Sequence, residues 1–310
     1  MASSVRKRMP AWSPSSAITA PPTSTVCGTT SAPDCLRRCT AWYKLLCMKS
    51  SASHAFSLVE LSIVLVILGL LTGGILAGQS LIHAAEMRSI STDINRYTTA
   101  MRSFQDKYFA IPGDMTNATA FWGAQDSGDG LGADCTGVDS TTPLTCNGNG
   151  SGNIYADNSG ATDAPEAYRA WQHLANAGLI EGSYRGKQTS GSLSITPGQN
   201  IPASKIGAGM GWFWNYRGFE NGTSGYFNGN YGQMIRLGSG QAARTAVISA
   251  QDMWNLDTKM DDGRPAYGVM RGNKSDTFPE CTTATAVTAD YKLDSTSGTA
   301  CSVQFIVQPM

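Results

Sequence analysis

A single carboxylate lies at the edge of a long apolar run in this sequence. Glu60 belongs to HAFSLVELSIVLVILGLL (residues 54–71), and the next residue of type Asp, Glu, Lys or Arg is Glu86. A charge at the centre of a bilayer costs about 2.5 to 3.5 kcal/mol. The sequence therefore poses the question of what Glu60 does at this position.

Residues for enzymatic chemistry are sparse. The histidines are His54, His83 and His173, which form no cluster in the sequence and suggest no His-centred triad. The glycine-rich segments GNGSGN and GTSGYFNGNYG contain neither GxxxxGKS/T nor GxGxxG. We therefore expect a protein that is not an enzyme, and we interpret His173 as a partly buried helix residue.

Two acidic groups offer oxygen ligands of the kind that suit calcium. They are Asp126, Asp129 and Asp134, and, further along, Asp257, Asp261 and Asp262. Neither group has the D-x-D/N-x-D/N-G spacing of a calcium loop. We favour solvated turns and expect no cofactor.

An aromatic group offers a sugar-stacking or adhesive surface. Its members are Trp212, Trp214, Tyr216, Phe219, Tyr226, Phe227 and Tyr231. Alternating aromatic residues on a strand more often form core, and we favour that interpretation.

Four of the eight cysteines follow the apolar run, at positions 135, 146, 281 and 301. An even number in an exported domain predicts two disulfides, although four cysteines allow three connectivities. We expect Cys135–Cys146 and Cys281–Cys301, because these pairs close short loops within segments rich in turn-forming residues. The four cysteines before the run lack the CxxC pairs of a structural zinc site.

The apolar run is long enough to cross a membrane. Residues 61–85 contain no Asp, Glu, Lys or Arg, and about 20 residues suffice to span as a helix. Basic residues before the run favour a cytoplasmic N-terminus and an exported C-terminal domain. Residues 1–47 are rich in Ser, Pro, Thr and Ala, a composition typical of disorder. We expect translation to start at Met48; the alternative is a genuine N-terminal extension.

Beyond about residue 79 the helix becomes amphipathic, ending at IPGD (residues 111–114). The apolar stripe is Met87, Ile90, Ile94, Tyr97, Met101, Phe104 and Tyr108. It is either a coiled-coil seam or, as we prefer, a face against which a sheet packs. Further on, the patterns predict an amphipathic helix with one apolar face within 163–180 and a helix at 250–260 that Ser249 caps. They also predict a half-buried strand at 211–218 and strands at 233–238 and 301–308. From Phe56 onward there are 16 basic and 22 acidic residues, so we expect no nucleic-acid partner.

The segment AFSLVEL (residues 55–61) resembles the prepilin signature: a small residue, an aromatic one, and a glutamate at the fifth mature position. The resemblance is to type IV pilins and type II secretion pseudopilins, and it covers residues 48–109. The family usually has glycine where this chain has Ala55. Further segments, such as AYRAWQHLANAGLIEG, look like those of large pilin-like proteins.

The resemblance implies a pilin-like α+β fold in which a long N-terminal helix packs against an antiparallel sheet. Residues 48–55 would be the leader and 56–109 the helix, spanning the membrane over about 56–78 and amphipathic over 79–109. Residues 110–310 would form the exported globular domain.

The resemblance also implies processing and assembly. Prepilin peptidase would cut between Ala55 and Phe56 at a bacterial inner membrane, and the new Phe56 amine would be methylated. Other pilin or pseudopilin subunits, the membrane platform and the assembly ATPase would be partners. The single-pass protein, with its C-terminal domain in the periplasm, would then enter a filament.

In such a filament Glu60 of one subunit would pair with the Phe56 ammonium of its neighbour. The alternative for Glu60 is a carboxylate that is protonated or snorkels to the interface. The size of the exported domain favours a minor subunit. A different class of function is a signal-anchored monomeric periplasmic binding or adhesive protein, for which Glu60 would have no use.

Overall fold

The protein is described from a computed structural model that covers residues 57–124, 144–155, 166–187, 193–222 and 225–307. The chain divides into two compact units, Met1–Ile67 and Leu68–Met310. The predicted upstream segment (1–47) and leader (48–55) lie outside the described residues. The interpretations of these two segments therefore stay predictions.

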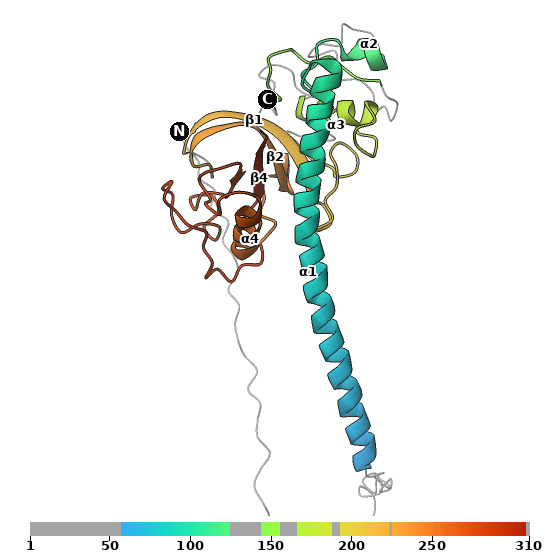
Figure 1. Cartoon of the computed structure of the whole chain (residues 1–310), viewed down its shortest axis with the longest axis vertical. Helices are drawn as coiled ribbons and strands as arrows, with labels where there is room; N and C mark the ends of the chain where they lie inside the picture. Colours follow the sequence, from blue (N-terminus) through green and yellow to red (C-terminus); the bar gives the residue numbers. More distant parts are fainter. Residues whose placement is uncertain (1–56, 125–143, 156–165, 188–192, 223–224, 308–310) are drawn as a thin grey trace, which may run out of the picture. The chain divides into compact units, whose positions relative to one another are not determined.

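One continuous helix, α1, runs from Leu58 to Tyr108 (Figure 1). The predicted stripe is buried at Ile90, Ile94, Tyr97, Met101 and Phe104, with Met87 and Tyr108 packed at its edges. These residues belong to the main hydrophobic core, so the stripe packs within the chain. Of the two interpretations, the packing face is therefore confirmed over the coiled-coil seam.

The helix ends where the IPGD motif predicts. Phe109, just beyond α1, has a φ of 52°, which takes the backbone out of the helix. Gly113 has a φ of 87°, and a Cβ there would lie 2.4 Å from the carbonyl oxygen of Glu166. Only glycine allows the turn after α1 to approach the next long helix this closely.

The sheet has four antiparallel strands in the order β1-β2-β4-β3. Their bounds are Gly211–Asn221 (β1), Asn228–Gly238 (β2), Met270–Arg271 (β3) and Val303–Val307 (β4). β1 and β2 are longer than predicted. The prediction that the first strand is half-buried is wrong, because residues 211–215 are buried on both faces of the sheet.

Aromatic residues join α1 to the sheet and to α3 (Glu166–Asn176). The ring of Tyr97 packs edge-on against Trp171 of α3 and Trp212 of β1, at centroid distances of 4.8 and 5.8 Å. The indole N–H of Trp212 also donates to the buried carboxylate of Asp93, at 3.2 Å. In Figure 1 this part of α1 runs alongside both elements. The fold is thus α+β, with a long apolar helix and an antiparallel sheet.

The remaining helices are α2 (Ala118–Trp122), the short 3-10 turn η3 (Gln241–Ala243) and α4 (Ala250–Met260). Ser249 caps α4 by accepting a hydrogen bond from the N–H of Asp252 at 3.0 Å, as the sequence predicts. α3 differs from the prediction of one apolar face. Residues 166–174 are all buried, because the loop at 144–149 forms hydrogen bonds with the polar side chains of Glu166, Arg169 and Gln172.

Candidate functional site

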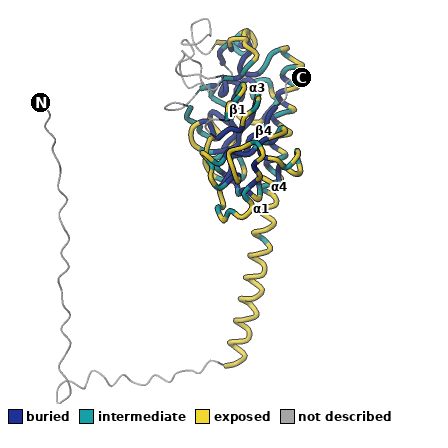
Figure 2. Tube along the Cα trace, turned by 90° about the vertical axis from the view of Figure 1, so that its left-hand side faces the viewer, coloured by how far each residue is buried: buried dark blue, intermediate teal, exposed yellow. Residues whose placement is uncertain are grey.

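The first half of α1 is an uncovered apolar surface. Its large side chains are each at least 50% exposed, and no residue of its most apolar 18-residue window is buried (Figure 2). We call residues Leu58 to Ile82 the exposed apolar segment. Its large apolar members are Leu58, Val59, Leu61, Ile63, Val64, Leu65, Val66, Ile67, Leu68, Leu70, Leu71, Ile75, Leu76, Leu81 and Ile82.

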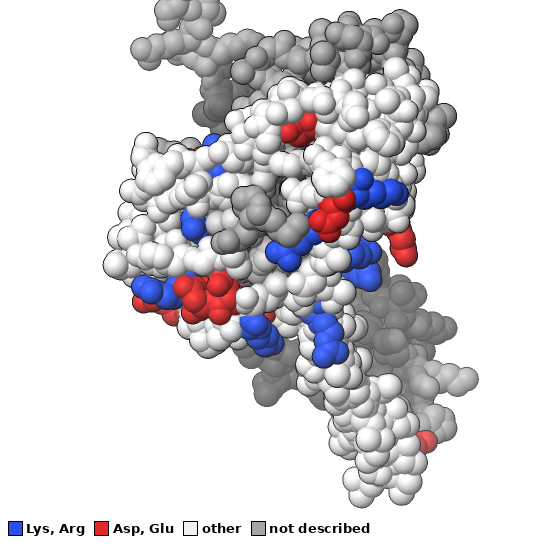
Figure 3. Space-filling model, turned by 45° about the horizontal axis from the view of Figure 1, so that its top comes forward, with Lys and Arg blue, Asp and Glu red and all other residues white. Residues whose placement is uncertain are grey.

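The length of this segment fits a bilayer. About 25 residues at 1.5 Å per residue give ~37 Å, against a hydrocarbon thickness of ~30 Å. Directly after it, His83 Nε2 lies 2.8 Å from Asp252 Oδ1 at the start of α4. Figure 3 shows this part of α1 with one small acidic spot on an otherwise uncharged visible surface, whereas basic and acidic side chains intermingle elsewhere. α1 is therefore a helix long and apolar enough to span a membrane.

Glu60 takes part in the N-terminal cap of α1. Its Oε2 accepts a hydrogen bond from the backbone N–H of Ser57 at 2.9 Å. In return, the Ser57 hydroxyl accepts one from the N–H of Val59 at 3.3 Å. The pattern Ser-x-x-Glu is a capping box, a signal that the sequence contained and that we did not predict. Glu60 thus has a role within its own chain besides any role between chains.

Phe56 and Ala55, the predicted processing residues, lie outside the described residues. The Glu60–Phe56 pairing therefore stays a prediction.

The structure joins Cys281 and Cys301 in a disulfide with a Cα–Cα distance of 5.0 Å. This is the pairing that their spacing predicts. Cys146 is also disulfide-bonded. Its predicted partner, Cys135, lies outside the described residues.

Tertiary folding brings the second acidic group together. Carboxylate oxygens of Asp257, Asp261 and Asp262 all lie within 4.8 Å of one another. Asp257 accepts bonds from the Tyr291 hydroxyl at 2.6 Å and from the Gly263 N–H at 3.1 Å. Asp261 and Asp262 also accept backbone N–H groups. The three side chains thus fasten the end of α4 to the following loops. The first group, residues 126–134, lies outside the described residues.

Burial sets the protonation of Asp257. It raises the pKa of this carboxyl to about 7, against an ordinary 3.8, and the hydrogen bond from Tyr291 offsets only part of that rise. Asp257 therefore titrates near neutral pH.

His173 is a core residue, more deeply buried than predicted. Its Nδ1 accepts a hydrogen bond from the N–H of Gly113 at 2.9 Å, and its Nε2 lies 2.9 Å from the Thr145 hydroxyl. Burial, reinforced by the positive charge of Arg169, lowers its pKa to about 3. The imidazole is neutral at physiological pH and ties the turn after α1 to α3.

Most of the aromatic group is core, as predicted. Trp212, Trp214 and Phe227 have no exposed surface, and Tyr226 and Tyr231 have almost none. The exceptions are Phe219, at 66% exposed, and Tyr216, which is partly buried. A broad stacking surface is therefore not available in this part of the chain.

Sequence reasoning missed a group of arginines that converges on Tyr226. Arg217 comes from β1, Arg236 from β2 and Arg244 from the loop after η3. Since they are distant in sequence and follow no motif, only the pairing of the strands brings them together.

Comparisons of the chain with protein-family models, with curated proteins and with solved structures found no match. The observations that bear on function therefore come from this chain alone. They are an exposed apolar segment with one carboxylate and the core contacts that the same helix makes further along.

Proposed function

We propose that this protein is a pilin-like structural subunit that is anchored in a membrane by α1 and assembles into a filament through the same helix. The filament would be a type IV pilus or a type II secretion pseudopilus, with this chain as a minor subunit. The observation that carries the proposal is the exposed apolar segment, which is uncharged except for Glu60.

A simple membrane anchor explains the apolar side chains but not the carboxylate. For an anchor, the capping box accounts for a hydrogen-bond acceptor at position 60 but not for a negative charge, because glutamine also completes such a box. In a filament, helices of neighbouring subunits would cover the apolar segment. Glu60 would then meet the Phe56 ammonium that cleavage creates, and the pair would fix the register between subunits.

The continuity of α1 supports the same function. One helix carries the exposed apolar segment and, from Ile90 to Phe104, the core contacts of the domain. The apolar segment and these core contacts thus belong to one secondary-structure element.

The proposal includes a location and a set of partners. The chain would cross the bacterial inner membrane once, with its C-terminal domain in the periplasm, before entering a filament. Prepilin peptidase would cut it between Ala55 and Phe56, and other pilin or pseudopilin subunits, the membrane platform and the assembly ATPase would act on it.

A signal-anchored monomeric binding protein is the second candidate. The arginine group around Tyr226 favours it, because such a group suits an anionic ligand. The two functions differ in their need for processing and for Glu60.

Mass spectrometry of the membrane fraction tests the proposal. We expect a mature chain that begins at N-methylated Phe56, and the same species in sheared filaments. A chain that keeps residues 48–55, or that never leaves the membrane fraction in cells that assemble filaments, would contradict the proposal and favour the monomeric anchor.

A further inference from the structure

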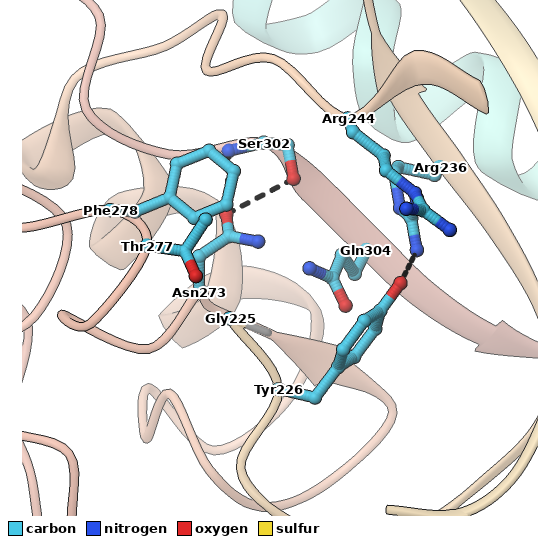
Figure 4. A pocket seen from close by; sticks show the side chains of 9 residues that line it. All are labelled: Gly225, Tyr226, Arg236, Arg244, Asn273, Thr277, Phe278, Ser302 and Gln304. Carbon is cyan, nitrogen blue, oxygen red and sulfur yellow. Dashed lines mark hydrogen bonds between the residues drawn. The ribbon is translucent and has the colours of Figure 1, made fainter. Parts of the chain in front are cut away.

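A cavity of about 140 Å³ opens beside the arginine group in the C-terminal domain. Figure 4 shows Arg236, Arg244 and Tyr226 on one side of it and Phe278 on the other. Gln304, on β4, lies between the two sides. The cavity thus combines cationic groups with an apolar ring.

Arg236 is buried without a counter-charge. It is 1% exposed, and it donates to the hydroxyl of Tyr226 and, at 3.2 Å, to the carbonyl oxygen of Ala242. Its Nε has no hydrogen-bond partner. Within the described parts of the chain, no carboxylate pairs with Arg236 or Arg244. Uncompensated burial of a charge is costly, so a site of this kind favours an anion from outside the chain.

The third arginine has a partner and adds to the local potential. Arg217 lies 2.9 Å from a carboxylate oxygen of Glu220 and 4.7 Å above the ring of Tyr226. Burial alone would raise the pKa of Tyr226, but the positive charges of Arg236, Arg217 and Arg244 lower it below its ordinary value. The potential around this phenol is therefore strongly positive.

A second unsatisfied group lines the same cavity. Oε1 of Gln304 is buried and accepts no hydrogen bond. An occupant that carries a hydroxyl or amide N–H beside its negative charge would satisfy it. Phe278 would contact the apolar part of such an occupant.

We infer that this cavity binds a carboxylate, held by Arg236 and Arg244, on a molecule that also carries a hydrogen-bond donor and an apolar or ring-shaped part. A guanidinium presents paired N–H groups that match the two oxygens of a carboxylate. The inference goes beyond the proposed assembly function, because none of these residues belongs to the exposed apolar segment. The carboxylate can come from a free sugar acid or from an acidic side chain of a polypeptide.

Calorimetry on the detergent-solubilised full chain tests this inference. The probes are glucuronate and a short peptide with a central glutamate, and their neutral counterparts are glucose and the same peptide with glutamine. We expect at least one acidic probe to bind tenfold or more tightly than its counterpart. The stronger acidic probe identifies the source of the carboxylate.

Arg244→Gln is the main variant, because Arg244 is exposed and its loss should leave the fold intact. The substitution removes one charge-assisted hydrogen bond to the carboxylate, so we expect the affinity to fall about tenfold or more. Arg264→Gln is the matched control, since Arg264 is an exposed arginine over Tyr267 and does not line the cavity. It should bind like the wild type.

Three results would overturn the inference. The first is that neither acidic probe binds better than its neutral counterpart. The second is that Arg244→Gln binds as the wild type does, or that Arg264→Gln loses as much affinity. The third is that inorganic phosphate, as a competing probe, binds more tightly than both carboxylates.

Discussion

Replacing Glu60 with glutamine removes a negative charge but keeps the cap of α1. The amide oxygen of glutamine can still accept the Ser57 N–H, which the Glu60 carboxylate accepts at 2.9 Å. Valine at position 60 removes both the charge and the acceptor. Ser57→Ala does the opposite, because it removes the hydroxyl that accepts the Val59 N–H and leaves the charge in place.

The cap and the charge pair of Glu60 differ in how much free energy their loss costs. Loss of a helix cap costs about 1 kcal/mol, or about a fivefold change in an equilibrium. A buried charge left without its partner costs about 3 to 5 kcal/mol, and each 1.4 kcal/mol is tenfold. If Glu60 pairs with a neighbouring Phe56 ammonium, Glu60→Gln should lower subunit association by about 100- to 4,000-fold. Ser57→Ala should lower it less than tenfold.

The assay expresses each variant as the sole copy and measures its amount in sheared filaments. Mass spectrometry confirms that each chain is cleaved, and non-reducing gels confirm that its disulfides form. We expect Glu60→Gln and Glu60→Val to be almost absent from filaments and Ser57→Ala to be present.

A wild-type amount of cleaved Glu60→Gln would refute the charge-pairing argument. If Glu60→Val alone were defective, the function of Glu60 would be the helix cap. The monomeric anchor would then become the better proposal.

Two further predictions concern the C-terminal domain. The pKa of Asp257 is about 7 in the folded chain, against an ordinary value of 3.8. Between these two pH values the folded state binds one proton that the unfolded state has lost. The free energy of unfolding should therefore fall as the pH rises from about 4 to about 7. Denaturant titration across this pH range should show a smaller fall in the free energy of unfolding for Asp257→Asn than for the wild type. Asp294→Asn, at an exposed aspartate, should behave as the wild type does. If the free energy of unfolding of Asp257→Asn fell as steeply with pH as that of the wild type, the argument would be contradicted. Ile94→Ala, in the fully buried stripe of α1, should lower the free energy of unfolding by about 2 to 5 kcal/mol. The same change at Ile63, which is 53% exposed, should leave domain unfolding unchanged, and equal effects of the two substitutions would show that the stripe does not hold the domain together.

Local patterns in the sequence predicted the helices well. Hydrophobic spacing identified the stripe of α1 from Met87 to Tyr108, and IPGD identified its end, because helix periodicity and backbone stereochemistry act over a few residues. Ser249 as the cap of α4 follows from the same kind of local rule. The capping box at Ser57 and Glu60 also depends only on residues three positions apart.

Only the tertiary structure decided which faces are covered. Residues 211–215 of β1 alternate in a way typical of a half-buried strand, yet all are buried. Trp212 packs against α1, and both Phe213 and Trp214 pack against rings of α3. The same applies to α3, whose polar residues were expected in solvent. Burial depends on neighbours that are distant in sequence, and a single segment carries no signal of them.

The sequence by itself determined the membrane-length helix and the position of Glu60 within it, and it led us to expect the pairing of Cys281 with Cys301 that the structure shows. The structure alone brought together Arg217, Arg236 and Arg244, and likewise joined Asp257 to Tyr291 across 34 residues. The physical reason is the separation in sequence between the residues that interact. Helix formation and capping depend on neighbours three or four residues apart. A binding cavity depends on strand register and loop packing, which the whole domain sets.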